Sequence, residues 1–317
     1  MIDLRKNSFR VSTVGAALLA AAGFVAVPAA AGAAEWSSLF LSTNKVEYID
    51  NFVNSVQNAA IRDDDIRLST NNQLIATGRL QDGIIVRVAG RLQYFQHVDR
   101  TDQDNLLLGG FADVGKRFGA LFARVGYFGD YRRKDGNNQY IENGADFTAR
   151  YAPNRSYALT ANVRGSYRDF DENNFPGLDQ TRIFASARAF WYPFQDRTFL
   201  MAETGLLDTN ADTNFQSNLL YFVGARAGYH INKKASIGLR AKYSNKEFDA
   251  GNPAVQGGIT REDDIFEVFG RVDYKFSKNV TGFAEAGVVD QQSNINTQDF
   301  TGPRVGVGVK LLFSTAK

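Results

Sequence analysis

The sequence contains no cysteine, two histidines, two methionines and six prolines among its 317 residues. Without cysteine the chain can form neither disulfides nor thiolate metal sites, and it offers no catalytic thiol and no cysteine for lipid attachment. Two histidines exclude most metal sites that are built from several histidines. We therefore expect no cofactor, no bound metal and no enzymatic activity.

Long hydrophobic runs are also scarce, and the mean hydropathy of −0.29 is too polar for a bundle of membrane-spanning helices. The one long uncharged run is 11–34, and it follows Arg5, Lys6 and Arg10. A charged start, an apolar segment and small residues are typical of a secretory signal peptide. We predict a signal peptide over 1–34, cleaved near Ala33 or Ala34; the alternative is an uncleaved anchor helix.

The chain that remains after the signal is removed has no excess of positive or negative charge. Removal of the signal takes away three bases and one acid, which leaves 33 of each. The slightly basic character of the full chain therefore belongs to the signal, and composition gives no support for a nucleic-acid partner. We expect that no nucleic acid is bound.

What the sequence does contain is a two-residue alternation of apolar and polar side chains from about residue 65 to the end. Residues 235–243 are apolar at every odd position, and 157–168 and 305–313 alternate in the same way. This period is typical of strands with one apolar and one polar face. The segments run for about ten residues, the length that a tilted strand needs to cross a bilayer.

The connections between these strands alternate between short turns and longer polar loops. Short turns lie near 82–83, 116–119, 152–155, 193–196, 232–234 and 277–279. Longer segments lie at 100–105, 132–139, 169–180, 209–217, 249–263 and 291–301. Short turns at one end and long loops at the other are typical of outer-membrane barrels, whose short turns are periplasmic.

Counting the strands predicts a barrel with an even number. Thirteen strands follow residue 64, at about 65–81, 84–98, 106–116, 119–131, 139–151, 156–168, 181–192, 197–208, 217–231, 234–247, 264–276, 279–290 and 302–313. Because single-chain bacterial barrels have even strand numbers, residues 38–50 are the candidate for one more. The sequence thus predicts an all-β, antiparallel, up-and-down transmembrane barrel of about 14 strands over 35–317.

At this point the chain resembles Gram-negative outer-membrane β-barrel proteins. The resemblance rests on the alternating strands, on turns such as Ile231-Asn232-Lys233-Lys234 and on the last strand, which ends at Phe313. Residues 46–51, together with the Ala-Glu-x-Gly segments that begin at Ala202 and Ala284, are similar to the β-barrel porin type 2 group. The resemblance implies residence in the cell outer membrane, and some members of the group are associated with surface polysaccharide systems.

The strand period assigns charged side chains to the interior of the barrel. The predicted pore-lining residues are Arg124, Arg164, Arg188, Glu203, Arg226, Arg240, Lys242, Arg271 and Glu285. Bases outnumber acids in this set, whereas acids crowd the long loops. We expect a basic interior that favours anions or acidic sugars; a wall of neutralising ion pairs that merely keeps the interior hydrated is the alternative.

With two histidines, the sequence offers few candidates for a hydrolytic active site. His97-Val98-Asp99 is the one candidate for a catalytic His/Asp pair, and His230 belongs to the opposite end of another strand. No Gly-x-Ser-x-Gly segment accompanies them. A histidine at a strand end is more often hydrated than catalytic.

These observations predict a porin-like channel for small hydrophilic solutes, with anions favoured. The alternative is a barrel component of surface polysaccharide export, or a structural outer-membrane protein without transport. The expected partners are outer-membrane lipid and lipopolysaccharide, small solutes, and the barrel assembly machinery through the last strand, 302–313.

Overall fold

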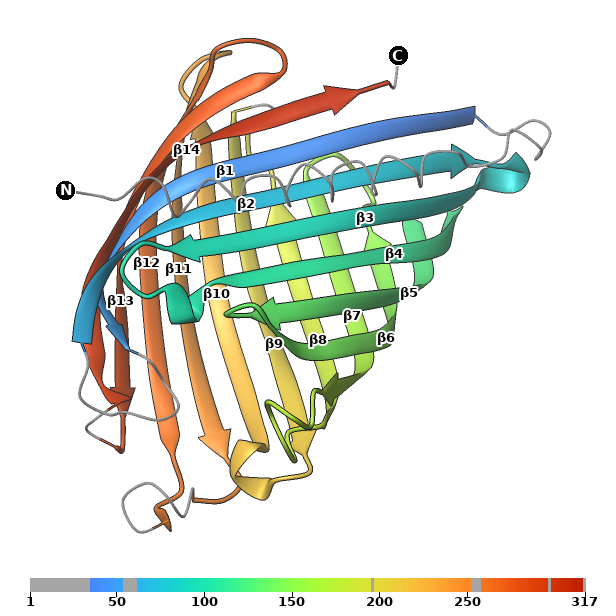
Figure 1. Cartoon of the computed structure of the whole chain (residues 1–317). Helices are drawn as coiled ribbons and strands as arrows, with labels where there is room; N and C mark the ends of the chain where they lie inside the picture. Colours follow the sequence, from blue (N-terminus) through green and yellow to red (C-terminus); the bar gives the residue numbers. More distant parts are fainter. Residues whose placement is uncertain (1–34, 54–61, 195–196, 252–257, 296–297, 316–317) are drawn as a thin grey trace.

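Fourteen antiparallel strands form a single closed barrel in the computed structural model, which describes residues 35–53, 62–194, 197–251, 258–295 and 298–315. Each strand pairs with its neighbours in sequence, and β1 pairs with β14 to close the barrel (Figure 1). The predicted fold class and strand number are confirmed. No helix in this part of the chain is long and apolar enough to cross a membrane.

The strands are 12 to 19 residues long, so each exceeds the roughly ten residues that cross a bilayer. Their bounds are β1 Glu35–Val53, β2 Arg62–Arg79, β3 Ile84–His97, β4 Asn105–Phe118, β5 Leu121–Lys134, β6 Asn137–Tyr151, β7 Tyr157–Phe170, β8 Gln180–Trp191, β9 Thr198–Ala211, β10 Asn218–His230, β11 Ala235–Phe248, β12 Glu262–Lys275, β13 Val280–Ser293 and β14 Phe300–Ser314.

The first strand is the one whose sequence signal was weakest. The predicted segment 38–50 lies within β1, which pairs on one side with β2 and on the other with β14. At the closing seam Val46 lies opposite Val307, and Lys45 lies opposite Gly308. The segment belongs to the sheet because its odd and even positions continue the two faces of its neighbours.

One predicted loop is wrong. The segment 132–139 was expected to be a long polar connection, but β5 continues to Lys134 and β6 begins at Asn137. Asp135 and Gly136 have φ angles of 49° and 77°, the left-handed conformation that a two-residue hairpin requires. Both strands reach this far because their backbone groups keep pairing where the side chains are polar.

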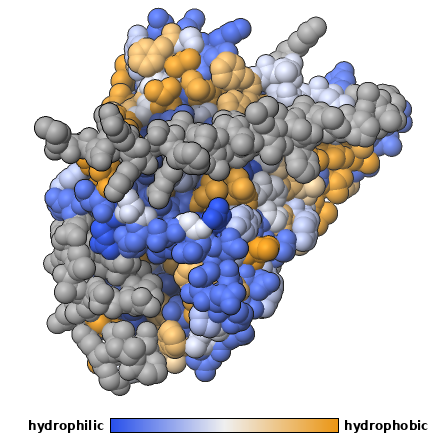
Figure 2. Space-filling view, in the orientation of Figure 1, coloured by the Kyte–Doolittle hydropathy of each residue, from blue (hydrophilic) through white to orange (hydrophobic). Residues whose placement is uncertain are grey.

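Apolar side chains gather on the outer face of the barrel. Leu159, Val223 and Leu239 are each more than half exposed, although they lie within strands. Hydrophilic residues gather at the end of the barrel where the longer loops lie, and apolar residues form patches at the top and along the right-hand edge of the view (Figure 2). An exposed apolar belt of this kind fits a lipid environment.

Tyrosines of the outer face lie near the loop end, where their hydroxyls reach carboxylates. Tyr48 donates to Asp64 over 2.7 Å, and Tyr167 donates to Asp179 over 2.7 Å. Amphipathic rings of this kind favour the depth of the lipid headgroups. Asp64 was expected in a loop but belongs to β2.

Cleavage of the signal peptide stays a prediction, because residues 1–34 lie outside the described residues. We expect the protein purified from outer membranes to have an intact mass that begins at Ala34 or Glu35. The measurement is mass spectrometry of the purified chain. A mass that retains residues 1–34 would support the uncleaved anchor instead.

Candidate functional site

The candidate site is the inner face of the barrel, where the polar half of each strand's alternation lies. In β10, for example, the outer positions Tyr221 and Val223 are about half exposed, while Arg226 belongs to the opposite face. Several ion pairs join strands that are not adjacent, so their side chains reach across the strand between them. Arg91 of β3 pairs with Asp130 of β5, and Lys45 of β1 pairs with Glu285 of β13.

One part of this face, from β3 to β8, is built of closely paired charges. Asp113 accepts hydrogen bonds from Arg87 over 2.9 Å and from Arg124 over 3.3 Å. Glu142 accepts from Arg168 over 2.7 Å and from Arg182 over 3.1 Å. These bases are held by carboxylates, so their charge is largely compensated within the wall.

A second paired region crosses the seam between β1 and β14. Lys45 contacts Glu47 over 2.7 Å and Glu285 over 2.9 Å. Arg271 contacts the same Glu285 over 3.2 Å and also Asp273 over 3.0 Å. The network therefore links β1, β12 and β13 where the barrel closes.

The wall from β8 to β11 is different, because bases there exceed carboxylates. Arg188 and Arg226 both contact Glu203 over 3.5 Å, so one acid serves two bases. Their side chains are 45% and 47% exposed, the largest values among the ion-paired bases of the described residues. Arg240 and Lys242 make no ion pair with any described residue.

Aromatic rings of the inner face hold these bases in place. The Lys242 ammonium lies 4.7 Å from the centre of the Phe222 ring, and the Arg240 guanidinium lies 4.6 Å from that of Phe269. Each ring packs against a glycine of the next strand. A Cβ atom at Gly205 or Gly287 would come within 2.6 Å or 2.5 Å of the ring, so glycine is required there.

The nine predicted pore-lining residues all belong to the face opposite the exposed apolar side chains. Arg124, Arg271 and Glu285 lie in the paired regions, and Glu203 lies between Arg188 and Arg226. Arg164 lies 4.4 Å from the centre of the Phe128 ring, and no ion pair joins it to a described residue. That these side chains line a conducting pore stays a prediction.

Sequence reasoning missed several charged residues of the inner face. The missed acids include Glu47, Asp130 and Glu142, and the missed bases include Lys45, Arg67, Arg168, Arg182 and Arg304. The two-residue period could have found them, because Asp130 has the parity of Arg124 and Glu142 has that of Asp146. The inner face is therefore more evenly charged than expected outside the β8–β11 wall.

His97 does not pair with Asp99, the partner that the sequence suggested. Its Nδ1 contacts the carboxylate of Asp65, and its backbone N–H donates to Asp104 over 2.7 Å. The Asp99 backbone N–H donates to the same Asp65 over 3.2 Å. His97 is 3% exposed, and the cluster fastens the connection between β3 and β4 to β2.

In that connection, burial raises the pKa of Asp102, but hydrogen bonds from Gln103 and Arg100 outweigh it, so the pKa is lowered below its usual range. Asp102 is therefore charged at neutral pH. It adds negative charge to the loop end of the barrel.

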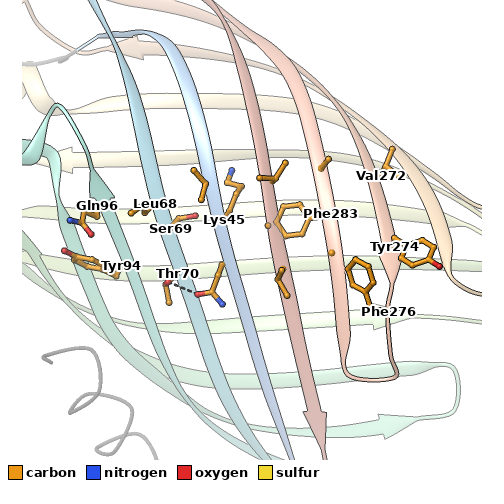
Figure 3. A pocket seen from close by; sticks show the side chains of 17 residues that line it. Lys45, Leu68, Ser69, Thr70, Tyr94, Gln96, Val272, Tyr274, Phe276 and Phe283 are labelled. Carbon is orange, nitrogen blue, oxygen red and sulfur yellow. Dashed lines mark hydrogen bonds between the residues drawn. The ribbon is translucent and has the colours of Figure 1, made fainter. Parts of the chain in front are cut away.

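A hollow of about 850 Å³ lies against the wall formed by β1, β2, β3, β12, β13 and β14 (Figure 3). Its lining is mostly apolar and belongs to the outer face, as at Leu68, Tyr94, Val272 and Tyr274. Lys45 also borders it, because the wall is a single strand layer thick. A hollow with this lining faces lipid, so it is not the site for hydrophilic solutes.

A closed antiparallel barrel with an apolar outer belt and a charged inner face defines an outer-membrane β-barrel protein, and the chain is one. The model of the family described as Putative beta-barrel porin 2 matches residues 167–313. No curated protein matches the sequence.

Solved structures of similar fold include three outer-membrane proteins. They are a loop L8 deletion mutant of OmpT, an outer membrane protein of Vibrio cholerae (TM-score 0.52, 10% identity, 89% of this chain and 100% of that one), the anion-selective porin from Comamonas acidovorans (0.51, 10%, 88% and 100%) and the outer membrane channel DcaP of Acinetobacter baumannii (0.51, 12%, 90% and 99%). At these identities the likeness concerns the fold alone.

Proposed function

We propose that the barrel is a porin-like channel that conducts small hydrophilic solutes and favours anions. The observation that carries the proposal is the β8–β11 wall, where Arg188, Arg226, Arg240 and Lys242 are served by a single paired carboxylate. A low-dielectric barrel wall focuses the field of such charges on the water inside, so they attract anions and repel cations.

Two further findings support the proposal. The family whose model matches 167–313 is described as a porin family, and one structure of similar fold is an anion-selective porin. Solute passage through such a pore requires polar lining but no catalytic residue, so the proposal includes no chemical step.

The proposal also includes the contacts of the barrel with lipid, lipopolysaccharide and the assembly machinery. The outer apolar belt lies in lipid, and the tyrosine–aspartate pairs of its loop end, such as Tyr243 with Asp264, lie at the depth of lipopolysaccharide headgroups. Carboxylates there bridge to lipopolysaccharide phosphates through divalent cations. The last strand, predicted at 302–313 and observed as Phe300–Ser314, is the segment offered to the barrel assembly machinery.

The test is the conductance of the purified protein in a planar bilayer, with its ion selectivity under a potassium chloride gradient. We expect stepwise channel insertion and a zero-current potential displaced toward that of chloride. The displacement should grow at low salt, because the screening length is ~30 Å at 0.01 M and ~10 Å at 0.1 M. Preference for cations would overturn the anion preference.

A folded protein with no conductance would overturn the channel itself. In that case the alternative is favoured: a barrel of a polysaccharide export system, or a structural protein without transport. Folding is checked independently by the mobility shift on heating that stable barrels show in gels.

A further inference from the structure

The strongest unexplained feature of the inner face is a pair of arginines that lie directly opposite each other. Arg226 of β10 faces Arg240 of β11 across the strand pair. In the described registers this is the one position where two lysine or arginine residues face each other; at equivalent places Arg87 faces Asp113 and Arg271 faces Glu285. Like charges that are directly opposite destabilise a sheet, because their Cβ atoms are only ~5 Å apart.

A third base extends the pair. Lys242 lies two residues beyond Arg240 on the same face of β11, opposite Gly224. Because Gly224 has no side chain, the Glu203 side chain of β9 lies over it, and a Cβ atom at Gly224 would come within 3.1 Å of the Glu203 carboxylate. Three bases from two neighbouring strands therefore converge on one patch of the inner face, which we term the Arg226 patch (Arg226, Arg240 and Lys242).

One carboxylate, that of Glu203, contacts this patch of three bases. Glu203 contacts Arg226 over 3.5 Å, but it also contacts Arg188 over the same distance. Glu267 faces Lys242 in the register of β11 and β12, yet the two make no ion pair. No acceptor among the described residues takes a hydrogen bond from a side chain of the Arg226 patch.

The side chains are nevertheless held in place. Arg240 and Lys242 lie against the rings of Phe269 and Phe222, and Phe222 stacks in parallel with Phe184 at 6.2 Å. A cation on a ring face keeps its N–H groups free for a ligand while its stem is fixed. Arg240 and Lys242 are therefore preorganised, and neither makes an ion pair with a described residue.

We propose that the Arg226 patch is a binding subsite for a doubly charged oxyanion of the phosphate class. Two guanidinium forks match the oxygens of a tetrahedral phosphoryl group, and the ammonium adds a compact third charge. Such an anion relieves the repulsion between Arg226 and Arg240. Chloride has one charge and no oxygen pair for a fork, so it binds less tightly. This inference rests on the proposed channel function and makes phosphate compounds its preferred solutes.

The experiment measures block of the chloride current through the channel by sodium phosphate, added at constant ionic strength and neutral pH. Wild type is expected to show saturable block. Arg240→Gln is expected to need about tenfold more phosphate for half-block, since a charge-assisted, two-pronged contact is lost. Arg240→Lys, which keeps the charge and loses the fork, should lie between the two.

The matched control is Arg164→Gln. Arg164 is also an inner-face base without an ion pair to a described residue, and it lies over Phe128 on the adjacent part of the wall. Its loss changes the net charge equally and is expected to alter ion selectivity while leaving the phosphate concentration for half-block within about twofold. Equal weakening in both variants would indicate general electrostatics and overturn the subsite.

Calorimetric titration of the detergent-solubilised barrel with phosphate separates this inference from the channel proposal. Phosphate binding that Arg240→Gln weakens, in a protein without conductance, would overturn the channel and keep the subsite. A conducting, anion-selective channel that phosphate neither blocks nor binds would overturn the subsite and keep the channel. A hexose phosphate in place of inorganic phosphate distinguishes the source of the phosphoryl group: equal block indicates that esters are accepted, and no block indicates inorganic phosphate as the ligand.

Discussion

Replacing Arg188 and Arg226 together by glutamine is expected to shift the zero-current potential of the channel toward that of a cation-preferring pore. Both side chains are nearly half exposed, and they share one carboxylate, so their charge is not neutralised within the wall. A unit charge 4–8 Å from a permeating ion in a water-like medium changes its energy by ~0.5–1 kcal/mol. Each lost charge should therefore lower the permeability to anions about twofold to sixfold and raise that to cations by a similar factor.

The measurement is the reversal potential in a potassium chloride gradient, for wild type and variant side by side. Lys233→Gln with Lys234→Gln is the matched control, because it removes the same two charges from the exposed turn between β10 and β11. The control should change the ratio little. Unchanged selectivity in the Arg188 and Arg226 double variant would show that this wall does not govern permeation.

The largest loss of stability is expected from Glu47→Ala. The Glu47 side chain is 4% exposed and contacts Lys45 over 2.7 Å and Arg67 over 2.5 Å. Its removal leaves Arg67 without its carboxylate and loosens Lys45, which also links β1 to Glu285 of β13. Breaking a buried ion pair costs ~3–5 kcal/mol, and we expect a value at the lower end because the bases are partly hydrated.

The readout is the temperature at which the compact band of the barrel converts to the unfolded band in a gel, supported by the free energy of unfolding in denaturant. Glu247→Ala is the control, since Glu247 is an exposed carboxylate of β11 without an ion pair to the other described residues. If Glu47→Ala melts at the same temperature as this control, the network at the seam contributes little to holding the barrel closed.

The sequence predicted which alternate residues of each strand face the interior and which face outward, but it did not predict where the strands end. The alternation at 235–243 and 305–313 predicted both faces correctly, since the direction of a side chain in a strand is fixed by the local backbone. The predicted loop at 132–139 failed because polarity was taken to mark a loop. Strand pairing there depends on backbone hydrogen bonds with the neighbouring strand, and these do not require apolar side chains.

The prediction that acidic residues crowd the long loops was likewise only partly right. Asp64 was expected outside the strands, but it lies on β2 and accepts a hydrogen bond from Tyr48. Asp65 and Asp264, the first residues of two predicted strands, lie within β2 and β12 and engage His97 and Tyr243. Side-chain partners on another strand cannot be recognised from one segment's composition. The negative charge of these aspartates is thus partly taken up by contacts within the wall.

By itself, the sequence determined the class of architecture and the sorting of side chains to two faces, because both follow from a two-residue period that each segment carries locally. Only the tertiary structure decided which charges meet. The contact of Arg91 with Asp130 spans an intervening strand, and that of Lys45 with Glu285 exists only because β1 closes against β14. The register that sets Arg226 opposite Arg240 likewise depends on how two strands slide past each other, which no single strand specifies.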